Sequence, residues 1–277
     1  SENGYKIDLI SKKMKYTHYP ETDLAELGLS LNSVSIIEVD NKMSLKVIWQ
    51  HLCCLFIFGT VFKGAHWAYC ALKTAKKLCK ENQYDAIITK NSPSELLGSY
   101  FKKKKGYKWI ATWNDPYPTK KYPKPYGNGV TAKLFILESP LLNLMEKADY
   151  HIFPNQRIRE YMRSYLNIPS EKTRIIPHVV IPREHHDTPH ENLRIVHLGN
   201  LLPPRDAATF LRALTEFIKN EQNAKIEIAF IGQTPQSVKD FVNSTHLEKY
   251  VKVFPPVKYK ESQQILESYD IQLIVEA

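Results

Sequence analysis

The chain of 277 residues has few cysteines and none of the spacings with which cysteine holds a metal. Its four cysteines are Cys53, Cys54, Cys70 and Cys79, which lie in apolar or helical surroundings with no C-x-x-C pair among them. Zinc sites and disulfide frameworks both depend on paired cysteines. We therefore expect four reduced thiols, as in a cytoplasmic protein, and no metal centre built on cysteine.

A long hydrophobic run is also missing. Residues 47–62, VIWQHLCCLFIFGTVF, form the most apolar stretch, but Gln50, His51 and Gly59 interrupt it. Because a transmembrane helix needs about 20 apolar residues in succession, we do not predict a membrane span. Two interpretations remain open: a buried helix, or an interfacial helix that rests on a membrane. The lysines of residues 65–81 suit either solvent or lipid headgroups.

Neither an internal repeat, a low-complexity tract nor a secretory signal is visible. The opening residues, SENGYKIDLIS, are typical of the last turn of a helix, capped at Gly4, and then a strand. We therefore expect the natural chain to begin upstream of Ser1. A length of 277 residues suffices for one large or two medium domains.

Positive charge is concentrated in the first part of the chain. Residues 1–180 hold 27 of the 38 lysines and arginines and 16 of the 29 acidic residues, whereas residues 181–277 hold 11 and 13. A one-sided basic surface suits anionic partners such as phospholipid headgroups, lipid diphosphates or nucleic acid, or simply keeps the protein soluble. No recognition helix or RNA-binding aromatic motif is present, so nucleic acid is not an expected partner.

Short apolar strands alternate with amphipathic helices along the chain, which predicts mainly parallel sheets with helices on both faces. The expected elements include strands at residues 5–11 and 35–39, an irregular loop at residues 120–129 and a helix at residues 134–147. Residues 181–192 interrupt this alternation, because apolar content falls and prolines appear. We predict an α/β fold of two Rossmann-like doubly wound domains, residues 1–180 and residues 193–277, joined by a linker at residues 181–192. The three histidines of the linker are not expected to bind a metal, since a flexible segment preorganises ligands poorly.

One turn organises the second domain. Residues 193–206, LRIVHLGNLLPPRD, predict a strand that ends at Gly199 and Asn200 and a helix that begins after Arg205. Backbone N–H groups at such a turn, with a guanidinium nearby, favour a phosphate, and glycine lets the backbone approach a ligand closely. The alternative is an ordinary turn whose Arg205 lies in solvent.

Later strands of the same domain end in similar turns. These turns are Gly232–Gln233, Pro255–Pro256 and the region of Glu276. Because the carboxyl ends of parallel strands lie along one edge of a sheet, we expect these turns to border a ligand crevice.

In the first domain, the strand at residues 109–112 delivers Trp113, Asn114 and Asp115 at its carboxyl end. Open α/β sheets bind ligands at that end of their strands. Asn114 and Asp115 are therefore candidate catalytic residues. The alternative for Asp115 is an Asx turn ahead of Pro116.

The order of these elements resembles the family 4 glycosyltransferases, retaining enzymes of the GT-B fold, in their bacterial polysaccharide-biosynthesis form. Residues 109–117, WIATWNDPY, are similar to the D-x-R-D-P-W segment of that family. Residues 148–180, which run from ADYHIFPN to TRIIPHVV, resemble its A-D-x-v to I-P-N-G-v segment. Residues 197–206, HLGNLLPPRD, resemble its G-x-L-x-x-x-K/R turn.

The resemblance implies that the second domain binds a nucleotide-sugar donor and the first binds the acceptor. By position it assigns six residues to the donor: Gly199, Asn200, Arg205, Gly232, Gln233 and Pro256. The first three would lie at the diphosphate and the last three beside the base and ribose. Asn114 and Asp115 would face the transferred sugar or the acceptor hydroxyl across the cleft.

The sequence departs from the family pattern in three places. Asn200 stands where the family has an arginine beside the glycine, and His178 replaces the asparagine of I-P-N-G. The sequence also ends at Ala277, before the E-x7-E segment that grips the donor ribose, and Glu276 matches neither of its glutamates. The resemblance thus implies an enzyme truncated at both ends, with an incomplete second domain.

We therefore expect a metal-independent retaining hexosyltransferase with no cofactor beyond its nucleotide-sugar co-substrate, because no D-x-D-like pair stands at a suitable position. It would transfer a sugar to a lipid-linked glycan in cell-surface polysaccharide biosynthesis, in the cytoplasm at the inner face of the plasma membrane. One alternative is a sugar-nucleotide epimerase of the same fold. The other is a non-catalytic membrane-surface module that has lost the site.

Overall fold

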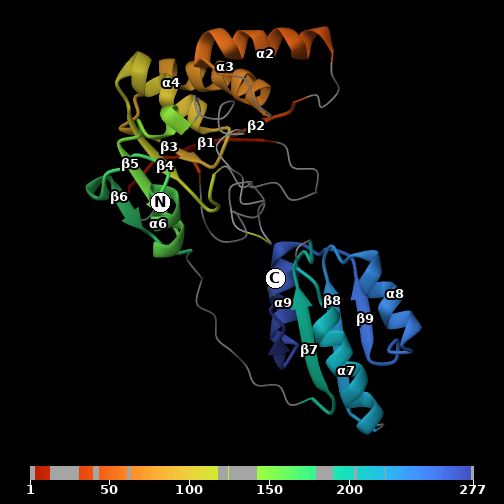
Figure 1. The fold of residues 1–277 in the computed structure, drawn as a ribbon. Helices are drawn as coiled ribbons and strands as arrows, with labels where there is room; N and C mark the ends of the chain where they lie inside the picture. The colour runs from red at the N-terminus through yellow and green to blue at the C-terminus, as the bar shows by residue number, and fades with distance from the viewer. Residues whose placement is uncertain are drawn as a thin grey trace. The chain divides into compact units, whose positions relative to one another are not determined.

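The computed structural model describes residues 4–12, 31–39, 44–60, 64–117, 124, 142–178, 190–202, 205–221 and 223–275. The chain divides into two compact units, residues 1–180 and residues 181–277. Each unit is an α/β structure built on parallel strands (Figure 1). Among the described residues, no helix has both the length and the apolar character needed to cross a membrane.

In its described residues, the first unit contains a four-stranded parallel sheet and a parallel pair of strands. The sheet has the order β3 (Ala86–Lys90), β4 (Lys108–Thr112), β5 (Tyr150–Phe153) and β6 (Thr173–Ile175). The pair consists of β1 (Asp8–Lys12) and β2 (Ser33–Ile37). The helices are α2 (Leu45–Phe58), α3 (Ala65–Glu81), α4 (Glu95–Lys105) and α6 (Gln156–Arg163), followed by the 3-10 turn η3 (Ser170–Lys172).

A buried tryptophan joins α4 to the sheet. Trp109 of β4 is fully buried, and its indole Nε1 donates a hydrogen bond of 2.8 Å to the Thr89 hydroxyl on β3. The ring packs against Gly98 of α4, where an added Cβ would lie 2.1 Å from the indole nitrogen. Glycine is therefore required at this helix position by packing, since a mid-helix glycine otherwise costs about 1 kcal/mol relative to alanine.

The first turn of α4 carries a buried carboxyl group. Glu95 is fully buried, and its carboxyl oxygens have no hydrogen-bond partner in the described part of the chain. Burial raises the pKa of Glu95 to about 8, because an ionised carboxylate is poorly solvated in an apolar environment. The side chain therefore carries its proton at neutral pH.

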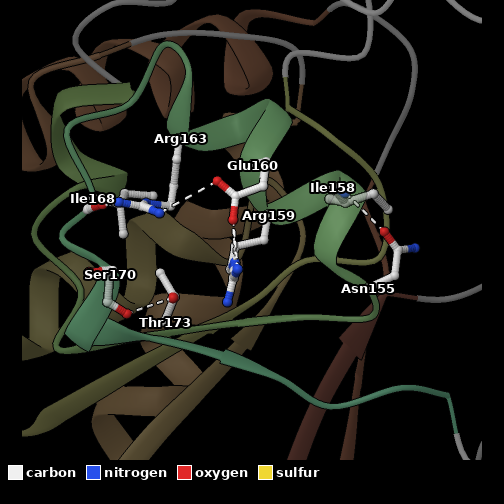
Figure 2. Close-up of polar contacts among 8 residues, drawn as sticks. All are labelled: Asn155, Ile158, Arg159, Glu160, Arg163, Ile168, Ser170 and Thr173. Atoms are coloured by element: carbon white, nitrogen blue, oxygen red, sulfur yellow. Dashed lines mark hydrogen bonds and ion pairs between the residues drawn. The ribbon is translucent and has the colours of Figure 1, made fainter.

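The segment around α6 is fixed by local polar contacts (Figure 2). Asn155 caps the helix, since its side-chain oxygen accepts a hydrogen bond of 2.9 Å from the Ile158 N–H. Arg163, at the other end, donates to the Ile168 carbonyl at 3.0 Å and lies 3.6 Å from Glu160. These contacts hold the connection from α6 to β6, within the segment that carries part of the family resemblance.

The second unit is a parallel sheet with helices on both faces. Its strand order is β10 (Ile271–Gln272), β7 (Leu193–Leu198), β8 (Ile226–Ile231) and β9 (Val251–Phe254). Its helices are α7 (Ala208–Asn220), α8 (Gln236–Ser244) and α9 (Tyr259–Glu267). Alternate residues of β7 face opposite layers: Ile195 belongs to the core under α7 and α8, whereas Val196 belongs to the core under α9.

Several predicted boundaries are wrong by a few residues. The strands expected at residues 5–11 and 35–39 occupy residues 8–12 and 33–37, because pairing between β1 and β2 sets their register. The helix expected at residues 134–147 is described only from residue 142. Apart from residue 124, the irregular loop expected at residues 120–129 lies outside the described residues.

The structure describes most of the apolar stretch as one helix. Its described part is the helix α2, followed by Gly59, whose left-handed backbone conformation ends the helix. Only Val47, Cys54 and Phe58 of this helix are buried. Most of the large apolar side chains of α2 are exposed, so the interpretation as a buried helix is wrong for the described residues, and the interfacial interpretation stays a prediction.

We predict that Gly98→Ala lowers the free energy of unfolding of the first unit by about 1–3 kcal/mol, the usual cost of overpacking a core. The new methyl group would displace Trp109 and weaken its hydrogen bond to Thr89. Urea unfolding followed by circular dichroism measures the change. Ser99→Ala on the same helix is the control, and an equal loss in both variants would contradict this account.

We also predict a pH dependence of stability that arises from Glu95. The folded-state pKa of about 8 lies above the ordinary value of 4.5, so its stabilising contribution is complete below about pH 4.5 and is lost as pH rises through about 8. Glu95→Gln cannot ionise and should remove this part of the slope. Urea unfolding at several pH values tests this, with the exposed Glu171→Gln as the control that leaves the slope unchanged.

Candidate functional site

The carboxyl ends of β7, β8 and β9 surround a cavity of about 550 Å³ in the second unit. This volume lies within the usual range for small-molecule sites, about 300–1,000 Å³. The lining residues come from the end of β9, from the turns that follow the three strands and from the start of α8: Leu201, Leu202, Gly232, Gln233, Thr234, Pro235, Lys239, Val253, Phe254, Pro255 and Pro256. Three residues predicted for the donor, Gly232, Gln233 and Pro256, therefore line one pocket.

Two glycines bring the first two turns into direct contact. Gly199 and Gly232 have φ values of 143° and 139°, a conformation that other residues rarely adopt. A Cβ at Gly232 would lie only 2.0 Å from the Gly199 carbonyl oxygen. The Gly199 N–H in turn donates to the Ile231 carbonyl at 2.9 Å. Gly232 is thus needed for turn-to-turn packing, whereas the space beside Gly199 is open.

Asn200 joins the same two turns through its side chain. Its amide oxygen accepts a hydrogen bond of 3.1 Å from the Gln233 N–H, and the Leu201 N–H donates to the Gln233 carbonyl at 2.8 Å. The side-chain oxygen of Asn200 is therefore engaged by the neighbouring turn. In the structure, Asn200 ties the turn after β7 to the turn after β8, which lines the pocket.

The start of α7 differs from the phosphate site expected there. The Asp206 carboxylate accepts a hydrogen bond of 2.8 Å from the Ala208 N–H, so a negative charge already lies at this helix end. Arg205 is exposed and is not among the residues that line the pocket. Arg205 follows the turn closely in the sequence, but its side chain does not line the pocket.

The start of α8 offers polar groups that the sequence reasoning missed. Pro235 precedes the helix, and no side chain caps its first N–H groups. The Thr234 hydroxyl is buried and has no hydrogen-bond partner among the described residues. Lys239, which lies at the end of the first turn of α8, is exposed and lines the pocket. The sequence signal that could have indicated these groups is a threonine and a proline before a helix, followed by a lysine one turn later.

In the first unit, Asn114 is joined to the loop after the neighbouring strand. The Asn91 side-chain oxygen accepts a hydrogen bond of 3.0 Å from the Asn114 N–H, and the Asn91 N–H donates to the Thr112 carbonyl at 3.1 Å. Asn91 adopts a left-handed conformation with φ 56°, which asparagine tolerates better than most residues. Asp115 is exposed beside this contact. The sequence reasoning missed Asn91.

A buried histidine packs against the tryptophan that precedes Asn114. His151 of β5 stacks with Trp113, and its Nδ1 lies 3.3 Å from the Trp113 Nε1, which donates to it. Burial, with smaller effects of Lys172 and Lys102, lowers the pKa of His151 to about 4. The imidazole is therefore neutral at physiological pH, and its contacts fix Trp113 directly before Asn114.

No group of three or more histidine, cysteine, aspartate or glutamate side chains that could hold a metal ion occurs among the described residues. Of the linker histidines, His190 is described, and its Nδ1 lies 2.9 Å from the Asp270 carboxylate. The other two, His185 and His186, lie outside the described residues.

Comparison with known sequences finds one family. Residues 54–184 match the profile described as Glycosyltransferase Family 4, a stretch somewhat shorter than half of the chain. It includes Asn114 and Asp115 and ends before the pocket of the second unit. Among curated proteins, none matches the sequence significantly.

Solved structures share the fold at low sequence identity. HepE from Anabaena, in complex with UDP, has a TM-score of 0.58 and 12% identity over 97% of this chain and 73% of its own. The lipopolysaccharide outer core galactosyltransferase WaaB has a TM-score of 0.55 and 12% identity over 96% and 73%. TarM, known from S. aureus, has a TM-score of 0.55 and 11% identity over 74% of this chain.

The chain spans only 39% of the length of TarM. Identities this low establish the fold and leave the activity open. The predicted α/β fold class is confirmed: the parallel sheets are those of the Rossmann-like GT-B architecture that these glycosyltransferases share.

Proposed function

We propose that the protein is a retaining GT-B glycosyltransferase of family 4 that moves a hexose from a nucleotide sugar to a lipid-linked glycan. The observation that carries the proposal is the pocket at the ends of β7–β9, which a contact between Gly199 and Gly232 shapes. The family match over residues 54–184 supports the reaction class. The similar structure of HepE holds UDP, which supports a nucleoside diphosphate as the ligand.

In this proposal the base and ribose of the donor lie beside Gly232, Gln233 and Pro256. The diphosphate extends past Gly199 toward Arg205, with Lys239 as a second cation. Negative charge develops on the diphosphate as the glycosidic bond breaks, and preorganised positive groups stabilise that charge. We propose that the two cations perform this task without a metal ion.

The acceptor side of the proposal lies in the first unit. Asn114, held by Asn91, and the exposed Asp115 are proposed to orient the acceptor hydroxyl or the transferred sugar. Fixed orientation of the two reactants supplies a large part of catalysis. A lipid-linked acceptor would place the protein in the cytoplasm, at the inner face of the plasma membrane, in cell-surface polysaccharide biosynthesis. The excess of lysine and arginine in residues 1–180 supports contact with an anionic membrane.

Two observations favour a second candidate function. Asn200 is engaged by Gln233, and Asp206 places a negative charge at the start of α7. Both features weaken the expected phosphate site. They favour a membrane-surface module that has the same fold but does not transfer sugar. The two functions differ in donor binding, which only the transferase requires.

We predict that UDP, GDP, ADP or TDP sugars raise the melting temperature of the protein, because a ligand that binds only the native state stabilises it. Arg205→Ala and Lys239→Gln should each weaken donor binding by about tenfold or more, the loss expected for a charge-assisted contact. Isothermal titration calorimetry measures the donor affinities of the two variants and of the wild type. The control is Lys219→Gln, in the last turn of α7.

Unchanged affinity in both variants would remove the assignment of the diphosphate. Absence of any donor binding would favour the membrane-surface module. Turnover of the donor without an acceptor would instead indicate an epimerase, which product analysis detects.

We predict that Asp115→Asn lowers the rate of sugar transfer by about tenfold to a thousandfold while the affinity for the donor is unchanged. Donor binding belongs to the second unit in this proposal, whereas Asp115 lies in the first. Transfer assays with a lipid-linked acceptor, combined with calorimetry, provide the two measurements. Glu171→Gln, an exposed change in the same unit, is the control, and an equal loss there would contradict a catalytic role.

A further inference from the structure

Most polar side chains of the helix α2 face the protein, whereas Lys46 is exposed. It packs against α3 and α4 of the first unit (Figure 1). Gln50 Nε2 lies 3.5 Å from the Cys70 sulfur on α3, and the Cys54 thiol donates to the Ala65 carbonyl at 3.1 Å. The centre of the His51 ring lies 5.3 Å from that of the His66 ring on α3, and His51 Nδ1 contacts the Val47 carbonyl of its own helix at 2.8 Å. The amide, imidazole and thiol groups of α2 are thus used on its inner face.

The outer face of α2 is the more apolar one. Leu45, Trp49 and Phe56 expose 86%, 64% and 87% of their surface. The full outer set follows the spacing of one helical face: Leu45, Ile48, Trp49, Leu52, Leu55 and Phe56. A helix in contact with water normally exposes its polar side chains, so this face is typical of a surface that binds an apolar partner or a membrane.

Lysines adjoin the carboxyl end of this face. A cavity of about 510 Å³ is bordered by Phe56 and Ile57 of α2, together with Lys76 of α3 and Lys103 and Lys104 of α4. Among the described residues, no acidic side chain pairs with these three lysines. Lys76 Nζ lies 4.9 Å from the centre of the Tyr100 ring. The cavity therefore combines an apolar wall with positive charge that no carboxylate neutralises in the described part of the chain.

We propose that this surface binds the face of an anionic phospholipid bilayer. The α2 surface is defined as the outer set of α2 together with Lys76, Lys103 and Lys104. Its apolar side chains enter the boundary between headgroups and acyl chains, and its lysines hold a headgroup phosphate in the cavity. Helix α2 lies in the plane of the membrane, because 14 residues are too few to span it.

The adjoining lysines favour a membrane over a protein partner. Aromatic and aliphatic side chains beside basic ones are typical of interfacial helices, and each lysine near an anionic surface strengthens the attraction. The inference rests on the membrane contact in the proposed function and names the surface that makes it. It is independent of sugar transfer. Vesicle binding and transfer can therefore fail separately.

Trp49 provides a direct test with the full chain. The other three tryptophans, Trp67, Trp109 and Trp113, are buried. Vesicles of phosphatidylcholine and phosphatidylglycerol in equal parts should shift the tryptophan emission to shorter wavelength and protect it from iodide quenching. The Trp49→Phe variant should lose this response, and vesicles of phosphatidylcholine alone should bind more weakly.

Two pairs of variants separate the apolar and the charged parts. Phe56→Glu should weaken vesicle binding by about tenfold or more, whereas Phe217→Glu, at an exposed ring on α7, should not. Lys76→Gln should weaken binding to the anionic vesicles by about fivefold. Lys77→Gln, next to it on the same helix and paired with Glu81, should have a smaller effect.

Three results would overturn the proposal. They are an unchanged Trp49 emission with anionic vesicles, equal binding by Phe56→Glu and the wild type, and shielding of Trp49 that follows self-association in sedimentation. The last result would assign the α2 surface to a second copy of the chain. Vesicle binding without sugar transfer would contradict the proposed function and leave this inference intact.

Discussion

The contact between Gly199 and Gly232 is the constraint on which the candidate site depends. The Gly199 carbonyl lies where any side chain at residue 232 would have to begin, so the turns after β7 and β8 can meet only because residue 232 is a glycine. Asn200 adds a second tie between the same turns. Together these contacts leave a cavity bordered by the next turn, with its two prolines, and by the start of α8. The rest of the second unit supplies the rigid sheet that holds this edge.

Much of the fold could be predicted because its signals are local and repeated. Apolar strands, glycine turns and amphipathic helices alternate in a regular way, and this order alone specifies parallel α/β units. The exact registers could not be predicted, since β1 and β2 are aligned by pairing between segments far apart in the sequence. The placement of Gly98 against Trp109 is likewise a tertiary fact with no sequence pattern of its own.

The candidate site was predictable in position but not in detail. The turns at Gly232 and Pro256 were identified because strand ends in parallel sheets share an edge. Thr234 and Lys239 were missed because a helix start without a capping side chain gives little signal. The carboxylate of Asp206 was overlooked, although it changes the electrostatics of the turn beside Arg205. Which face of α2 is exposed depends on its contacts with α3, which no local pattern contains.

Helix α4 connects the two regions of interest in the first unit. It begins at Glu95, directly after the loop of Asn91 that holds Asn114, and ends in the lysines that adjoin the α2 surface. Eleven residues of α-helix extend about 16 Å. In the proposed function, a lipid-linked acceptor whose phosphate lies at these lysines would have its reactive hydroxyl about one length of α4 away, beside Asn114.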